Sequence, residues 1–174
     1  MVHSVELLFD HGTEKAVGRM WDDLLTAGIR SLATHRSPSN RPHVTLSVAE
    51  SMDDSVDDAL CGLLDRLPMR CVLGAPTLFG GGRTVTLVRM LVPSEKLLGL
   101  HADVHRVCLP HVSGGPLPHT EPGQWTPHVT LARRVPPDQL ATAMMQPGMF
   151  GDISATAVAL RHWDGNNRVV HPIG

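Results

Sequence analysis

A five-residue segment that occurs twice constrains this chain of 174 residues more than any other feature. Residues 42–46 and residues 127–131 both read Pro-His-Val-Thr-Leu. Apolar and polar residues alternate in and after each copy, which is typical of a β-strand with one buried face. We expect the buried faces to carry Val44, Leu46, Val48, Val129 and Leu131, and the open faces to carry His43, Thr45, Ser47, His128, Thr130 and Ala132. Each strand therefore presents an imidazole and a hydroxyl about 6–7 Å apart on its open side.

The first copy lies in the middle of a series of strands and helices. A strand, a helix, the copy itself, a second helix and a further strand are expected over residues 2–9, 13–28, 42–48, 53–67 and 70–79. Thr13 can cap the first helix, and Gly28 can end it. The irregular segment before the first copy carries Arg30, Arg36 and Arg41 and contains no acidic residue.

The same order of elements is expected again after the glycines at 80–82. A strand, a helix, the second copy, a short helix and a strand are expected over 84–92, 94–107, 127–132, 136–146 and 153–163. Ser94 is expected to cap the helix over 94–107. The Gly- and Pro-rich segment 109–127 reads as a loop and is a candidate lid over the site. A turn at 164–167 allows residues 168–171 to pair back as a hairpin.

The chain thus reads as β-α-β-α-β written twice, with one extra strand, and it is typical of an internal duplication. We expect a single domain over residues 1–174, with two pseudo-symmetric lobes that correspond to sequence repeats at about 1–79 and 83–174. Two similar lobes side by side would bring the two His-Thr strands together across a central groove.

The composition excludes several classes of protein. A hydrophobic content of 42% and a mean hydropathy of −0.02 are typical of a soluble globular protein, and no apolar run approaches the ~18 residues of a membrane span. The N-terminus lacks the basic and apolar regions of a signal peptide. A formal charge of −2 argues against a protein dedicated to duplex nucleic acid. Cys61, Cys71 and Cys108 have no CxxC spacing and are expected to be reduced core thiols, which favours a cytoplasmic location.

The two His-x-Thr-x motifs, His43-Val44-Thr45-Leu46 and His128-Val129-Thr130-Leu131, resemble those of the 2H phosphoesterase superfamily. The chain length, the motif separation and the duplicated order of elements are similar to its bacterial 2′-5′ RNA ligase and 2′,3′-cyclic phosphodiesterase branch. The resemblance implies an α+β fold in which two lobes of duplicated βαβαβ units place antiparallel sheets around a central groove. It also implies metal-independent chemistry on 2′,3′-cyclic phosphates or 2′-5′ linkages, without a cofactor.

The residue types suit this chemistry. Opening a 2′,3′-cyclic phosphate removes a proton from the attacking water and delivers one to the departing ribose oxygen, on opposite sides of phosphorus. Two imidazoles hold opposite protonation states around neutral pH more readily than two carboxylates or two lysines. We expect His43 and His128 to be the catalytic pair, and Thr45 and Thr130 to donate hydrogen bonds to the non-bridging phosphate oxygens. Weak analogy with the family favours His128 as base and His43 as acid.

Three further residues are candidates for substrate binding. Arg133 can bind the phosphate or an RNA backbone, and Arg41 can guide a polyanion to the groove; ordinary surface positions stay open for both. Trp125 can stack on a nucleobase, with a core position as the alternative. With three Trp, three Phe and no Tyr, the chain suits a short RNA end or a mononucleotide better than a long RNA.

A metal site is the main rival interpretation. His101 and His105 have the i, i+4 spacing of a helical zinc pair. The segment lacks the glutamate of the zinc-protease signature, and His111 or His119 would have to supply a third ligand. Core or surface positions for these histidines are favoured, and we expect no metal.

The sequence predicts a monomeric cytoplasmic hydrolase of RNA processing, a 2H-type cyclic phosphodiesterase that opens the 2′,3′-cyclic phosphates of RNA ends or nucleotides to 2′-phosphates. Two alternatives stay open for the same groove. It can join RNA ends reversibly through a 2′-5′ linkage, or it can bind a cyclic or 2′-5′-linked nucleotide without turnover.

Overall fold

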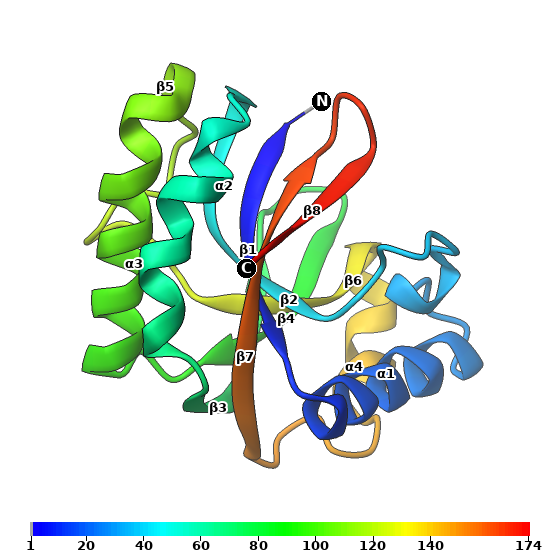
Figure 1. Ribbon diagram of the computed structural model, residues 1–174. Coiled ribbons are helices and arrows are strands. Elements are labelled where there is room, and N and C mark those ends of the chain that lie inside the picture. The colour runs from blue at the N-terminus through cyan, green and yellow to red at the C-terminus, as the bar shows by residue number, and fades with distance from the viewer. Residues whose placement is uncertain (1) are drawn as a thin grey trace.

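The computed structural model describes residues 2–174 and has the predicted α+β fold. Helices α2 and α3 cover one side of the strands, and α1 and α4 lie on the other (Figure 1). The strands are β1 (His3–Phe9), β2 (His43–Met52), β3 (Met69–Phe79), β4 (Val85–Leu91), β5 (Val112–Pro116), β6 (His128–Val135), β7 (Ile153–Asp164) and β8 (Val169–Ile173). The α-helices are α1 (His11–Thr26), α2 (Ser55–Leu60), α3 (Glu95–Cys108) and α4 (Leu140–Met144). Short 3₁₀ helices span Leu32–Thr34, Cys61–Arg66, Leu109–His111 and Pro137–Gln139.

The strands form one antiparallel sheet in the order β5-β2-β1-β7-β3-β4-β6, and β8 pairs with β7. β1 pairs with β2 from its own half of the chain and with β7 from the other half. β4 likewise pairs with β6 from its own half and with β3 from the other half. The two halves of the sequence therefore exchange their last strands, β3 and β7. One half-sheet is formed by β5, β2, β1 and β7, and the other by β3, β4 and β6. Each half-sheet thus contains strands from both halves of the sequence.

β3 and β7 are long because each serves two half-sheets. Residues 69–73 of β3 pair with residues 153–157 of β7. The rest of β3 pairs with β4, and the rest of β7 pairs with β1 and β8. In the strand order, β2-β1-β7 corresponds to β6-β4-β3, so β2 and β6, which carry the two motifs, have equivalent places in the sheet.

The helices are exchanged in the same sense. α3, from the second repeat, packs on β2 of the first, and α1, from the first repeat, packs on β6 and β7 of the second. α1 begins at His11, because the side chain of Asp10 accepts the backbone N–H of Thr13. The prediction that Thr13 caps this helix is therefore wrong, whereas the predicted cap of α3 by Ser94 is confirmed.

Other local predictions need correction. The helix expected over 53–67 is α2 followed by the 3₁₀ helix Cys61–Arg66. The segment 109–127 is not all loop, because β5 pairs with the edge of β2 and leaves only residues 117–127 irregular. Cys71 and Cys108 are buried free thiols, but Cys61 is exposed. No helix within residues 2–174 is long and apolar enough to cross a membrane.

Candidate active site

A β-bulge interrupts the first motif strand. Glu6 pairs with Thr45, whereas the preceding Val5 pairs with Ser47, so that Leu46 is an extra residue on β2. An extra residue reverses the face on which the following side chains lie. Ser47 is accordingly buried and Val48 lines a cavity, which reverses the faces predicted for these two residues.

The second motif strand has its bulge at the same place. Val88 pairs with Thr130, and Leu87 pairs with Ala132, so that Leu131 is the extra residue on β6. Ala132 is fully buried instead of lying on the open face as predicted. The strands keep the histidine and threonine of each motif on one face, and each bulge buries the residue two positions after the threonine, Ser47 in β2 and Ala132 in β6.

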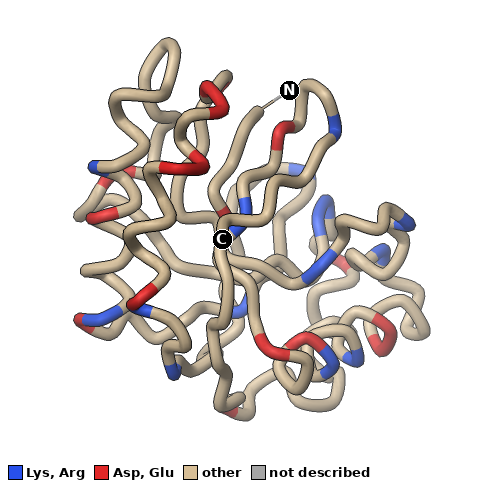
Figure 2. The backbone as a smooth tube through the Cα atoms, viewed as in Figure 1, with Lys and Arg blue, Asp and Glu red and all other residues tan. Residues whose placement is uncertain are grey.

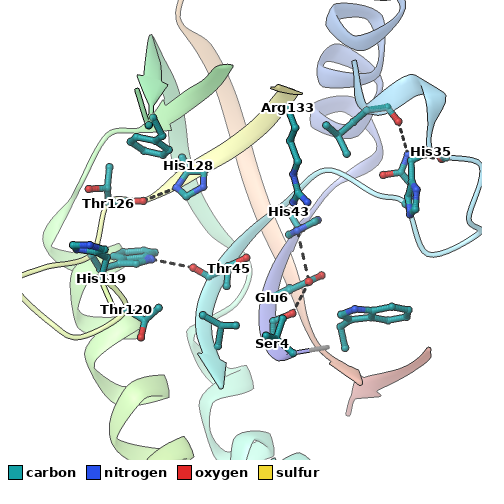
Figure 3. Close-up of a pocket in the computed structure, with 18 of the residues that line it drawn as sticks. Ser4, Glu6, His35, His43, Thr45, His119, Thr120, Thr126, His128 and Arg133 are labelled. Carbon is teal, nitrogen blue, oxygen red and sulfur yellow. Dashed lines mark hydrogen bonds and ion pairs between the residues drawn. The ribbon is translucent and has the colours of Figure 1, made fainter. Parts of the chain in front are cut away.

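The motif histidines line one cavity of about 1170 Å³ (Figure 3). β1, β2 and β6 contribute to its wall, together with the segments 30–40 and 118–126. The cavity contains the predicted residues His43, Thr45, His128, Trp125 and Arg133.

Both histidines are oriented by the same contact. Nδ1 of His43 lies 2.7 Å from the carbonyl oxygen of Arg41, and Nδ1 of His128 lies 2.7 Å from that of Thr126. In each case the carbonyl belongs to the residue before the motif proline. Because a carbonyl only accepts hydrogen bonds, Nδ1 carries a proton in both rings, and Nε2 is the nitrogen that exchanges protons.

The surroundings of His128 favour its neutral form. Phe79 contacts the imidazole edge-on, with ring centroids 4.7 Å apart and an interplanar angle of 81°. Burial lowers the pKa of His128 below its ordinary value. The bond to the Thr126 carbonyl opposes this shift, and the positive charges of His43 and Arg133 add to it.

The surroundings of His43 are charged instead. Oε1 of Glu6 lies 3.6 Å from Nε2 of His43. Figure 3 shows this contact and also shows Arg133 extending toward His43 from β6. Glu6 was not among the residues predicted from the sequence, because only strand pairing places β1 beside the first motif.

A pair of tryptophans holds the two motif threonines. The indole N–H of Trp125 donates to the carbonyl oxygen of Thr45 at 2.9 Å, and that of Trp21 donates to the carbonyl oxygen of Thr130 at 3.0 Å. Trp125 also stacks on His101, with ring centroids 3.9 Å apart. At least one face of this indole is therefore already covered by protein.

Two predicted residues lie outside the cavity wall. The guanidinium of Arg41 pairs with Glu14, and both its Nε and one Nη lie 2.7 Å from the carboxylate. Thr130 follows His128 on the same face of β6, but it is not one of the residues that line the cavity.

The zinc pair considered from the sequence does not form a ligand set. Nε2 of His101 lies 2.9 Å from the carbonyl oxygen of Thr120, inside the core. No group of three or more His, Cys, Asp or Glu side chains within residues 2–174 is arranged to hold a metal ion.

One end of the cavity is basic. Ser31 forms an isolated bridge to Ala132, which sets Arg30 opposite Arg133, and Arg134 also lines the cavity. Arg134 has a backbone φ of 57°, a left-handed conformation that is uncommon for residues other than glycine. The segment between α1 and β2 carries further arginines and no acidic residue (Figure 2). Arginines directly opposite one another repel, so this end is suited to an anion.

The fold resembles solved proteins at low sequence identity. TT0787, a protein of Thermus thermophilus, has a TM-score of 0.59 and 14% identity, and the match covers 100% of this chain and 96% of that one. Escherichia coli LigT in its apo form has a TM-score of 0.54 and 15% identity, and the match covers 99% of this chain and 94% of that one. Kluyveromyces marxianus Usb1 has a TM-score of 0.52 and 13% identity, and the match covers 98% of this chain and 97% of that one. No curated protein sequence matches this chain.

The sequence itself matches a family model. The model of the 2′-5′ RNA ligase superfamily matches residues 14–167, a range that includes both His-x-Thr-x motifs. The solved structures support the fold, and the family match confirms the relationship that the motifs predicted. The chain therefore belongs to the 2′-5′ RNA ligase superfamily.

Proposed function

We propose that this protein is a metal-independent phosphoesterase that opens 2′,3′-cyclic phosphates of RNA ends or nucleotides to 2′-phosphates. One observation carries the proposal. The two motif histidines line a single cavity, and each ring is tied through Nδ1 to a carbonyl so that Nε2 is left for proton transfer. Membership of the superfamily supports phosphoesterase or ligase chemistry in general.

The reaction follows from the two environments. Nε2 of His128 takes a proton from water as the water oxygen bonds to phosphorus. The bond between phosphorus and O3′ breaks, and Nε2–H of His43 donates its proton to O3′. The products are a 2′-phosphate and a free 3′-hydroxyl, with His128 protonated and His43 neutral. Exchange with solvent restores both rings. The lowered pKa of His128 keeps this base unprotonated near neutral pH.

The threonines bind the phosphate in this proposal. The carbonyl of Thr45 is already held by Trp125, so its hydroxyl remains available to a non-bridging oxygen. Thr130 occupies the same place in its motif, two residues after His128, and the proposal gives its hydroxyl the same role although it lies just outside the cavity wall. Arg133 adds positive charge beside both histidines. The side chain of Arg41 pairs with Glu14 and is not available to the phosphate. Arg41 contributes instead through its backbone carbonyl, which orients His43.

The proposed substrate is an RNA end or a small nucleotide with a cyclic phosphate, and it can carry a further phosphate. Arg30 and Arg134, which line the same cavity near Arg133, support a second anionic group beyond the reacting phosphate. The related LigT has been solved in complexes with 3′-AMP, ATP and NADP+, which supports nucleotides as ligands. We propose a monomeric enzyme that acts in RNA processing. We also propose a cytoplasmic location, since the buried free thiols Cys71 and Cys108 suit a reducing compartment.

The test is turnover of a 2′,3′-cyclic nucleotide in EDTA by the wild type and by His43→Ala and His128→Ala. We expect chelator-resistant formation of the 2′-phosphate and a loss of at least ~10²-fold in each variant. His11→Ala, at an exposed position on α1, is the matched control and should retain full activity. Turnover that survives either motif substitution would place the chemistry elsewhere. Binding without turnover in the wild type would support a nucleotide-binding module instead.

A further inference from the structure

A buried ion pair lies beside only one of the two motif strands. Glu6 on β1 pairs with Thr45 of the first motif on one side and with Arg161 of β7 on the other. The side chains of Glu6 and Arg161 are each 6% exposed. Nε of Arg161 lies 2.7 Å from Oε2 of Glu6, and one Nη lies 2.6 Å from the same oxygen.

The equivalent place beside the second motif has no charge. The two bulges align Glu6 with Val88, which pairs with Thr130 of the second motif and with Thr77 of β3. Taking two charges out of water is costly, and uncharged residues of similar volume often serve stability equally well. Since the second half of the fold has uncharged residues here, the fold itself does not require an ion pair at this place.

The ion pair holds a carboxylate oxygen toward His43. Arg161 occupies Oε2 of Glu6, and the hydroxyl of Ser4 donates to Oε1 at 2.8 Å. Arg161 also donates to the carbonyl oxygen of Ser39 at 2.9 Å, which fixes the guanidinium from the opposite side. Oε1 keeps room for a second donor, and Nε2 of His43 lies 3.6 Å from it.

The charged and titratable groups around His43 are different on each side. Glu6 faces Nε2 from β1, with Arg161 behind it on β7, while His128 and Arg133 approach from β6. A carboxylate only accepts hydrogen bonds, so it pairs with Nε2 when that nitrogen carries hydrogen. His128 has the edge of Phe79 as its neighbour instead of a carboxylate.

We propose that Glu6 is a positioning residue that keeps a proton on Nε2 of His43 and thereby makes His43 the acid and His128 the base. The inference rests on the proposed function and deepens it. During turnover the proton on Nε2 of His43 passes to the leaving O3′, and Glu6 stays ionised beside Arg161 without receiving a proton. His43 then regains its proton from solvent and faces Glu6 again.

The experiment is the pH dependence of kcat for Glu6→Gln on a 2′,3′-cyclic nucleotide. Loss of the Glu6 carboxylate should move the basic limb of the pH–rate profile, which reports the loss of the proton from the acid His43, toward lower pH. We expect kcat at pH 8 to fall about tenfold, the fall at pH 6 to be less than about threefold, and KM to change less than about twofold. The acid limb should not move. Asp103→Asn, which removes a carboxylate from a surface ion pair with Arg66 and Arg106, is the matched control and should leave both limbs in place.

A second variant covers the case in which an unpaired Arg161 prevents folding. Glu6→Gln combined with Arg161→Gln removes both charges and should show the same shift of the basic limb. If circular dichroism shows that both are unfolded, Glu6→Asp keeps the ion pair but draws the carboxylate away from His43, and a smaller shift in the same direction is expected. An unmoved basic limb in the folded variants overturns the proposal, and so does a shift of the acid limb instead.

Failure of the proposed function is distinguishable from failure of this inference. If the wild type turns over no cyclic nucleotide, NMR titration of the ring protons of His43 and His128 reads the same effect directly. His43 should then titrate at lower pH in the folded Glu6 variants than in the wild type, and His128 should keep its midpoint. Equal His43 titration in wild type and variants overturns the role of Glu6.

Discussion

Trp125 offers a test that separates two roles for one indole. The sequence leaves a nucleobase platform and a core position open for Trp125, whereas the structure shows its N–H bound to the carbonyl of Thr45 and its ring stacked on His101. Trp125→Phe removes the N–H and keeps an aromatic ring against His101. If the indole acts by positioning Thr45, this substitution should lower kcat, because the threonine hydroxyl loses its fixed place beside the phosphate.

The expected magnitudes follow from one lost hydrogen bond. An uncharged hydrogen bond contributes about 1 kcal/mol, and a carbonyl left without its donor raises the cost to about 1–2 kcal/mol. For a chain of this size the melting temperature should fall by about 2–8 °C. If the loss of Thr45 positioning reduces the stabilisation of the transition state by about 1 kcal/mol, kcat should fall about fivefold while KM stays within about twofold.

The assay combines thermal unfolding with steady-state kinetics on a 2′,3′-cyclic nucleotide. Trp163→Phe is the matched control, because Trp163 also lines the cavity. A Trp125→Phe variant that equals the wild type in both melting temperature and kcat would refute the reasoning. A tenfold rise in KM at unchanged kcat would show that the indole binds substrate directly.

Three further predictions concern pH and stability. Phe79→Ala should expose His128 and bring its lowered pKa back toward the ordinary value, so that the acid limb of the pH–rate profile moves to higher pH; Phe79→Leu, which keeps the site covered, should move it less. Burial also lowers the pKa of His3 and His101, so the unfolded chain binds more protons and stability should fall as the pH drops below about 6.5. Melting temperatures between pH 8 and 5 should show this loss, and His101→Gln should reduce it; a flat profile would contradict it. Arg89→Met should lower the unfolding free energy by about 3–5 kcal/mol in urea titrations, because the buried guanidinium donates to four backbone carbonyls. A loss below about 1 kcal/mol would show that those carbonyls find other donors.

Local patterns predicted most of the elements. Neighbouring residues determine the end of the first helix before Gly28, the cap of α3 by Ser94 and the turn before β8, and the structure contains each of them. Predictions failed where a distant segment decides the conformation. β5 forms because the edge of β2 accepts it, and Val48 faces the cavity because a bulge against β1 intervenes.

The site shows the same division. The sequence by itself determined that two identical motifs, with two imidazoles and two hydroxyls, would occupy equivalent strands, because strand periodicity and duplication are encoded by short segments. Only the tertiary structure decided that the halves exchange their last strands and that Arg161 of β7 thereby meets Glu6 of β1. It also decided that Trp125 holds Thr45 and that Phe79 covers His128. These contacts join residues far apart in the chain, and their pairing depends on the register of the whole sheet, which no local pattern specifies.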